Sequence, residues 1–175
     1  PNKVVVYRLD GPISTIRQKD RDIDRIIRVW SAAITDGIIF QSRWCEEQNR
    51  QKFGIISKYQ TVIYNAPDPT IFHLPTSQPS HLSTSPIKLI ATSWSNNPRK
   101  GFDIYQFLDE HLNFKKYTMT FVGNAPVTFK RIKTLAPMPS HELASVLRNH
   151  DIFITASKTD PCSNSLIEAL SCGLP

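Results

Sequence analysis

The sequence predicts an α/β protein made of two domains, each with a parallel sheet covered by helices. Short apolar runs alternate with amphipathic helical patterns along most of its 175 residues. Such alternation is typical of parallel strands joined by crossover helices. A stretch rich in proline, serine and threonine, over residues 65–86, interrupts the alternation and has no periodicity. We therefore expect a domain boundary inside that stretch.

The first block of alternation begins with an apolar run at residues 4–7, which predicts a short buried strand. Residues 20–34 predict an amphipathic helix, because apolar side chains recur there at helical spacing. The side chains expected to face the core are Ile23, Ile26, Ile27, Trp30 and Ile34. The block continues with strands at residues 38–40 and 59–64 and, between them, a helix that Ser42 caps and Gly54 ends.

The second block repeats the pattern, with strands expected at residues 88–94, 117–122 and 151–156. Helices are expected at residues 102–112, 140–148 and 163–172, the last with Leu166, Ala169 and Leu170 on its packed faces. This βαβαβα run predicts right-handed crossovers and a doubly wound sheet. The chain stops where the next strand should begin and starts with proline, so we expect a piece of a longer chain.

Composition narrows the class of protein and ligand. The net charge is +6, which favours an anionic partner. The three cysteines form no CxxC pair and the five histidines form no HxxxH pair, so neither a disulfide framework nor a metal site is expected. A membrane-spanning run and a signal peptide are also missing, which makes the reducing cytoplasm the expected location.

Several catalytic and binding motifs are missing as well. The sequence contains no GxGxxG, no GxxxxGK and no GxSxG. A dinucleotide fingerprint, a P-loop and a serine-nucleophile elbow are therefore not expected. Basic residues are dispersed rather than interleaved with aromatics in a stripe, so nucleic acid is not an expected partner.

Three polar clusters each follow an expected strand of the second block, at residues 93–101, 123–126 and 157–165. Ligands of open α/β sheets bind outside the carboxyl ends of the strands, so the clusters should line one crevice. Arg99 and Lys100 bring positive charge to it, and the turn at residues 163–165 begins a helix, where backbone N–H groups attract anions. Together these features predict a phosphate or diphosphate ligand.

Glu168 has two interpretations that the residues alone leave open. It follows Asn164 by four positions on the last expected helix, so both side chains lie on one side of that helix. Its carboxylate could accept hydrogen bonds from sugar hydroxyls, or it could compensate the dipole of the first helical turns.

The last cluster resembles a known signature. DPCSNSLIEALSCGLP is similar to the signature of family 4 retaining glycosyltransferases, which have the two-domain GT-B fold: an acidic residue, seven intervening residues, then glutamate. Asp160, in place of the usual glutamate, and Glu168 occupy the two acidic positions. NNPRKGFD resembles the basic phosphate loop of the family, and TFVGNAP its glycine-terminated central strand, ending here at Gly123. IIFQSRW and VIYNAPDPTIFHLP resemble the last strands of its N-terminal domain and its interdomain linker.

The resemblance implies two Rossmann-like domains, both incomplete in this chain. Residues 1–66 would be the C-terminal part of the acceptor domain, 67–87 the linker, and 88–175 the donor-binding domain. The implied activity is hexosyl transfer, with retention of anomeric configuration, from a UDP- or GDP-linked sugar to a glycan or small-molecule acceptor that the sequence does not identify. We expect no metal or other cofactor, no turnover by this chain alone, and a basic surface compatible with peripheral membrane association.

The resemblance also implies residue roles. Arg99 and Lys100 would neutralise the departing diphosphate, and Glu168 would hold the ribose. Asp160 would contact hydroxyls of the donor sugar. The backbone N–H groups around Ser163, Asn164, Ser165 and Leu166 would hold sugar or phosphate.

Two other functions remain to be weighed against a glycosyltransferase. One is a non-catalytic module that binds sugar nucleotides or polyanions, in which Arg99 and Lys100 only bind. The other is a glycoside hydrolase that uses Asp160 and Glu168 as its carboxylate pair. We rank the hydrolase lower, because one carboxylate is expected on a loop and the other inside a helix.

Overall fold

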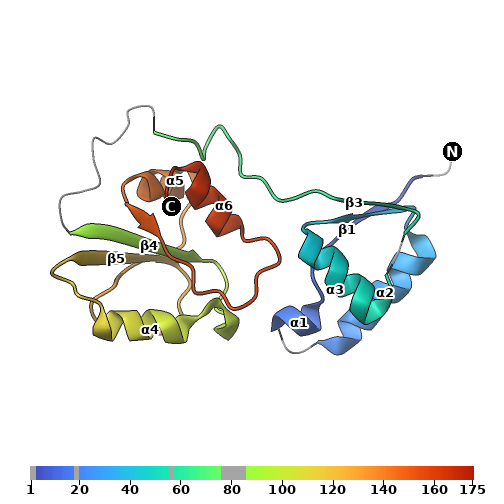
Figure 1. The fold of residues 1–175 in the computed structure, drawn as a ribbon, viewed down its shortest axis with the longest axis horizontal. Helices are drawn as coiled ribbons and strands as arrows, with labels where there is room; N and C mark the ends of the chain where they lie inside the picture. The colour runs from blue at the N-terminus through green and yellow to red at the C-terminus, as the bar shows by residue number, and fades with distance from the viewer. Residues whose placement is uncertain (1–2, 18–19, 56, 76–85) are drawn as a thin grey trace. The chain divides into compact units, whose positions relative to one another are not determined.

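The computed structural model describes residues 3–17, 20–55, 57–75 and 86–175. The chain divides into two compact units (Figure 1). Unit 1 consists of Pro1–Asn65 and Thr159–Cys162, and unit 2 of Ala66–Lys158 and Ser163–Pro175. Within the described residues, no helix is both long and apolar enough to span a bilayer.

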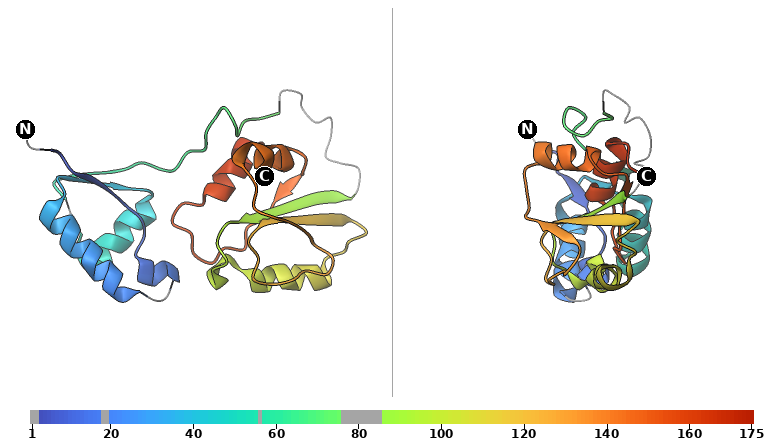
Figure 2. Two further views of the ribbon diagram at one scale, coloured as in Figure 1. Left: turned by 180° about the vertical axis from the view of Figure 1, so that it is seen from behind. Right: turned by 90° about the vertical axis from the view of Figure 1, so that its left-hand side faces the viewer.

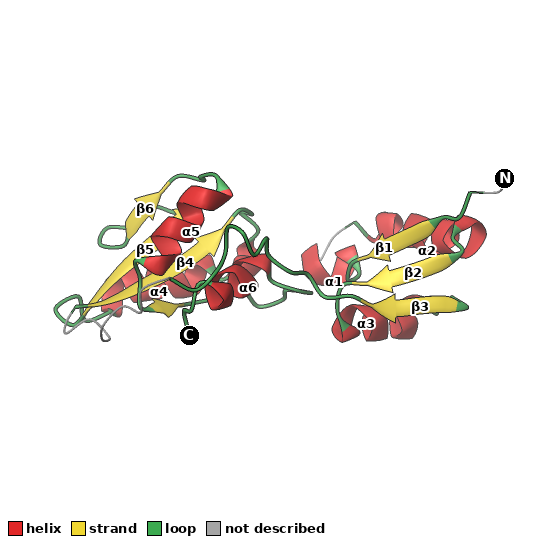
Figure 3. Cartoon of the chain, turned by 90° about the horizontal axis from the view of Figure 1, so that it is seen from above, coloured by secondary structure: helices red, strands yellow, loops and turns green. Residues whose placement is uncertain are grey.

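Unit 1 is built on a parallel sheet of three strands in the order β1-β2-β3. Its strands are β1 (Val6–Leu9), β2 (Gly37–Phe40) and β3 (Tyr59–Val62), and its helices are α1 (Ile13–Arg17), α2 (Arg21–Ile34) and α3 (Arg43–Phe53). Helices α2 and α3 cover the same face of this sheet (Figures 1 and 3), as two right-handed crossovers in one direction require. Its core consists of Leu9, Ile38, Phe40, Cys45 and Ile55.

The apolar stripe of helix α2 is not oriented as the sequence predicts. The helix forms where the spacing predicts it, but Ile23, Ile26, Trp30 and Ile34 are exposed. Asp24 and Ser31 are buried instead. The carboxylate of Asp24 accepts hydrogen bonds from the N–H groups of Ile13 and Ser14, at 2.7 and 2.9 Å, and so satisfies two backbone donors at the start of α1. The inward side of α2 therefore combines Asp24 and Ser31 with Ile27, which packs against the core as expected.

The first strand also departs from expectation. It begins two residues later than the predicted strand at residues 4–7, and it lies at an edge of the sheet. Val4, Val5 and Val6 are exposed rather than buried. The apolar run therefore correctly predicts a strand here, but the burial expected for it is wrong.

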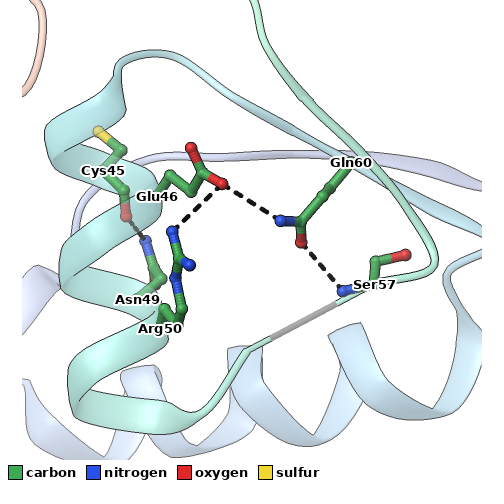
Figure 4. A network of polar contacts seen from close by, with 6 residues as sticks. All are labelled: Cys45, Glu46, Asn49, Arg50, Ser57 and Gln60. Atoms are coloured by element: carbon green, nitrogen blue, oxygen red, sulfur yellow. Dashed lines mark hydrogen bonds and ion pairs between the residues drawn. The ribbon is translucent and has the colours of Figure 1, made fainter.

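A polar network ties α3 to the segment that leads into β3 (Figure 4). The Glu46 carboxylate accepts from Gln60 at 3.2 Å and from Arg50 at 3.5 Å. The Gln60 side-chain oxygen accepts from the N–H of Ser57 at 3.2 Å. At the start of the helix, the Ser42 hydroxyl accepts the N–H of Cys45, as expected for an N-cap.

Unit 2 has a parallel sheet of four strands in the order β6-β5-β4-β7. Its strands are β4 (Ile87–Ser93), β5 (Tyr117–Gly123), β6 (Lys133–Leu135) and β7 (Ile152–Phe153). Its helices are α4 (Phe102–His111), α5 (Ser140–Arg148), α6 (Asn164–Ser171) and the 3₁₀ helix η1 (Pro98–Lys100). Helix α4 covers one face of the sheet and α5 and α6 cover the other (Figures 1 and 2), which confirms the doubly wound arrangement.

The core of unit 2 has two layers, one on each side of the sheet. Neighbouring residues of β4 point to opposite layers: Leu89 and Ala91 pack toward α4, and Ile90 packs toward α5 and α6. The α5 side contains the expected Leu143, Ala144 and Leu147. Phe72, from the proline-rich stretch, is also buried there.

Four further features differ from the sequence prediction. Helix α1 and strand β6 were not expected, and β7 is only two residues long. Leu170, expected on a packed face of α6, is 52% exposed. The buried side of this helix is formed by Ala169 and continues to Cys172.

Candidate functional site

The loops that carry the candidate residues of unit 2 follow neighbouring parallel strands. Strand β4 is paired with β5 along its whole length and with β7 on its other side. Because these strands are parallel, their carboxyl ends lie at one edge of the sheet. The loops after β4, β5 and β7 therefore start from the same edge, as the sequence predicts.

The loop after β4 forms a small rigid turn around the basic pair. The Asn97 side chain accepts the N–H of Arg99 at 3.0 Å and caps η1, and Pro98 occupies the first position of the turn. Arg99 and Lys100 are half-buried. Gly101 ends the turn with a φ of 78°, in the left-handed region that favours glycine.

The basic turn is joined directly to the loop after β7. A Cβ atom at Gly101 would lie 2.1 Å from the carbonyl oxygen of Ala156, so only glycine fits this contact. The N–H of Lys158 donates to the carbonyl of Arg99 at 2.8 Å. The Lys158 ammonium lies 2.7 Å from the Asp103 carboxylate. This contact lowers the pKa of the Asp103 carboxyl, and the hydrogen bond from Lys158 is the largest cause. The basic turn and the first residues of the loop after β7, up to Lys158, therefore form one hydrogen-bonded structure.

The loop after β5 is joined to the end of β4. Gly123 has a φ of 120°, and a Cβ atom there would lie 2.0 Å from the carbonyl oxygen of Ser93. The N–H of Asn124 donates to that same carbonyl at 2.9 Å. The Asn124 side chain donates to the carbonyl of Trp94 at 2.8 Å. Gly123 thus lets the ends of β4 and β5 approach closely. Asn124 can then hydrogen-bond to the loop that follows β4.

A recess of about 470 Å³ lies beside these two loops. Gly123 and Trp94 both line it. The other lining residues, from the ends of β4 and β5 and from β6, are Ser95, Asn96, Asn124, Ala125, Pro126, Val127 and Thr134. Its volume falls within the range of small-molecule sites.

Glu168 is half-buried in the second half of α6. Burial raises the pKa of its carboxyl. Among the residues that the structure describes, its carboxylate accepts no hydrogen bond and forms no ion pair. A half-buried carboxylate without a protein partner is a ready acceptor for hydroxyl donors of a ligand.

The start of α6 is already partly capped. The Ser163 hydroxyl accepts the N–H of Leu166 at 3.4 Å and lies 3.0 Å from the hydroxyl of Ser165. The N–H of Ile167 donates to the Ser163 carbonyl. Of the backbone donors predicted to hold a ligand, that of Leu166 therefore already has a partner inside the helix, and the exposed Asn164 lies at the first helical position.

Asp160 belongs to the segment Thr159–Cys162, which groups with unit 1, whereas the other candidate residues belong to unit 2. Asp160 is half-buried. Across residues 3–17, 20–55, 57–75 and 86–175, no three histidine, cysteine or acidic side chains gather in a way that could hold a metal ion.

Sequence reasoning missed the residues that hold the loops in place. Asn124 was part of a predicted cluster, but its bond to Trp94 joins residues 30 positions apart and has no local signal. Asp109 was not singled out at all, although it is buried and accepts three backbone N–H groups of the segment before β6. The one signal in the sequence was that this aspartate occupies a position of α4 expected to face the core, where an acidic residue needs hydrogen-bond partners.

No protein-family model matches the chain, and no curated protein matches its sequence. Solved structures that share its fold include two proteins of about twice its length. Anabaena HepE, solved in complex with UDP and glucose, has a TM-score of 0.78 and 19% identity over 99% of this chain and 52% of its own. Sucrose-phosphate synthase from Thermosynechococcus elongatus has a TM-score of 0.75 and 14% identity over 97% of this chain and 48% of its own.

These similarities establish the fold. The chain has the α/β architecture of Rossmann-like domains found in GT-B glycosyltransferases, which confirms the predicted fold class. It spans about half the length of the two solved structures.

Proposed function

We propose that the protein transfers a sugar from a nucleotide-diphosphate donor to an acceptor hydroxyl. In this reaction the bond between the anomeric carbon and the diphosphate oxygen breaks, and the diphosphate leaves with the electron pair. A bond forms between that carbon and the acceptor oxygen, whose proton is released. Negative charge therefore develops on the diphosphate, and positive groups beside it accelerate the reaction.

The basic turn after β4 is the observation that carries the proposal. The backbone that carries its two cations is held by the Asn97 cap and by the bond from the Lys158 N–H to the Arg99 carbonyl, at the edge where α/β sheets bind ligands. Arg99 and Lys100 would neutralise the leaving diphosphate. A cation on a backbone that is already in place needs little reorganisation as charge develops, which suits this role. That the structural neighbour HepE was solved with UDP and glucose supports a nucleotide-sugar donor.

The two acidic residues have proposed roles of their own toward the donor. Glu168, half-buried and without a protein partner among the described residues, would accept hydrogen bonds from the ribose hydroxyls. Asp160 would contact hydroxyls of the sugar. Gly123 and the start of α6, with Ser163, Asn164, Ser165 and Leu166, would border the donor.

A donor screen on the full-length protein tests this function. We expect thermal stabilisation by one group of UDP- or GDP-linked sugars, followed by acceptor-dependent release of the nucleoside diphosphate. Lys115→Ala is a matched control for Lys100→Ala, because Lys115 is exposed and precedes β5, at the opposite edge of the sheet. Donor binding without transfer would favour the non-catalytic module, and cleavage of simple glycosides without a nucleotide would favour the hydrolase.

The finer assignments are part of the same proposal. We assign the protein to family 4, with hexosyl transfer, retention of configuration, no cofactor and a cytoplasmic location with peripheral membrane association. The anomeric proton coupling of the product, measured by NMR, tests retention. Full activity after exhaustive chelation would support a reaction without a metal, and loss of activity that added Mg²⁺ restores would contradict it.

A further inference from the structure

Trp94 combines an exposed aromatic ring with a fixed backbone. Its side chain is 62% exposed although it directly follows the buried end of β4. Its carbonyl accepts from the Asn124 amide at 2.8 Å. On either side of it, the Ser93 hydroxyl donates to the Ser95 carbonyl at 2.8 Å, and the N–H of Asn97 donates to the Ser95 hydroxyl at 3.2 Å. The indole is therefore presented from a rigid loop.

Rigid presentation of an aromatic ring favours binding. A side chain on a fixed backbone loses little conformational entropy when a ligand stacks on it, so more of the stacking energy appears as affinity. Tryptophan has a large apolar face and two side-chain torsions, which suits it to flat rings.

The recess beside Trp94 provides the polar groups that a flat heterocycle needs. Asn96 and Thr134 line it with an amide and a hydroxyl, which together can donate and accept. Ala125 and Val127 add apolar lining. Its volume of about 470 Å³ is large enough for a ring of one or two cycles with an attached sugar.

The same loop carries the two cations of the basic turn. Arg99 follows Trp94 by five positions, and the cap on η1 fixes the turn between them. A ligand that contacts both the Trp94 ring and the two cations must carry a flat ring and an anionic group. A nucleoside diphosphate has this combination.

We infer that Trp94 is the stacking platform for the nucleobase of the donor, in the recess between the ends of β4 and β5. This inference rests on the proposed function, because it assumes a nucleotide donor. Trp94 contributes affinity through stacking, and Asn96 and Thr134 contact the edge of the base.

Calorimetric titration of the full-length protein with UDP, GDP and inorganic pyrophosphate tests the inference. Trp94→Ala should weaken binding of the preferred nucleotide roughly 5- to 100-fold, as the loss of one stacked base does elsewhere, and leave pyrophosphate binding unchanged. Trp94→Phe should retain most of the affinity, because it keeps a ring. Phe107→Ala is the matched control: Phe107 is 57% exposed in the same unit, on α4 and outside the recess.

The outcomes separate this inference from the proposed function. If nucleotides bind and Trp94→Ala retains wild-type affinity, the stacking role is wrong and the donor site stands. If Trp94→Ala weakens pyrophosphate and nucleotide equally, Trp94 only supports the loop, and the inference is again wrong. If the wild-type protein binds neither UDP nor GDP, the proposed function fails with it.

Discussion

Replacing Asp109 should loosen the segment that leads into β6. This carboxylate is 5% exposed and accepts the N–H groups of Lys130, Arg131 and Ile132 at 2.7, 2.8 and 2.7 Å. Asp109→Asn keeps the shape but places an NH₂ group where one N–H now donates. One hydrogen bond becomes a donor–donor contact, and the other two lose their charged acceptor.

The structure sets the expected magnitude. Hydrogen bonds to a charged group contribute about 1.5–3 kcal/mol and neutral ones about 0.5–1.5 kcal/mol, so losing one and weakening two should cost about 3 kcal/mol. The bonds to Lys130 and Arg131 are only part-buried, which keeps the sum near the lower limit. For a unit of this size, the melting temperature should fall by roughly 10–15 °C.

Calorimetry and hydrogen exchange together measure the effect. We expect Asp109→Asn to lower the transition of unit 2 and to speed exchange of the amides at 130–132. Glu110→Gln is the matched control, because Glu110 is the exposed neighbour on the same helix and the charge change is identical. A melting temperature for Asp109→Asn within about 3 °C of this control would refute the reasoning.

The pH dependence gives a second check on Asp109. Burial by itself would raise the pKa of this carboxyl, but the three backbone donors and the Lys130 charge bring the pKa below its usual value. A lowered folded-state pKa means that the ionised group stabilises the fold fully above the unfolded pKa of about 3.9. This stability is lost as the pH falls from there through the folded pKa. The stability difference between wild type and Asp109→Asn should therefore shrink below about pH 4.

Three further substitutions test the candidate site. Lys100→Ala should lower kcat for sugar transfer roughly 10²–10³-fold, as measured at saturating donor, and a change of about twofold or less would rule out its leaving-group role. Glu168→Gln should weaken donor binding by about 1.5–3 kcal/mol in calorimetry with little change in melting temperature. Because burial raises the pKa of Glu168, wild-type donor affinity should fall as the pH drops through that raised value, and the variant should lack this dependence. Gly123→Ala should destabilise unit 2 by at least about 2 kcal/mol in chemical denaturation, because the added methyl meets the Ser93 carbonyl at a positive φ, and an unchanged midpoint would contradict that contact.

The sequence alone determined the features that depend on neighbouring residues. Periodicity and apolar runs placed β4, β5 and α5, because core-facing positions recur at the spacing of the element itself. The basic turn was visible as Asn97, Pro98 and Gly101, each of which has a local conformational preference. The pattern of Asp160, seven intervening residues and Glu168 indicated the fold, which the solved structures confirm.

Only the tertiary structure decided which faces are buried and how the loops are joined. Most of the apolar stripe of α2 is exposed, and the buried Asp24 carboxylate accepts instead from the N–H of Ile13 in α1, a contact that helical spacing does not encode. The backbone carbonyl of the exposed Trp94 is held by the Asn124 side chain, which comes from the loop after β5. Asp109 likewise acts on a segment more than 20 residues away. Such contacts depend on which groups the folded chain brings within hydrogen-bonding distance, so they leave no pattern in the neighbouring residues.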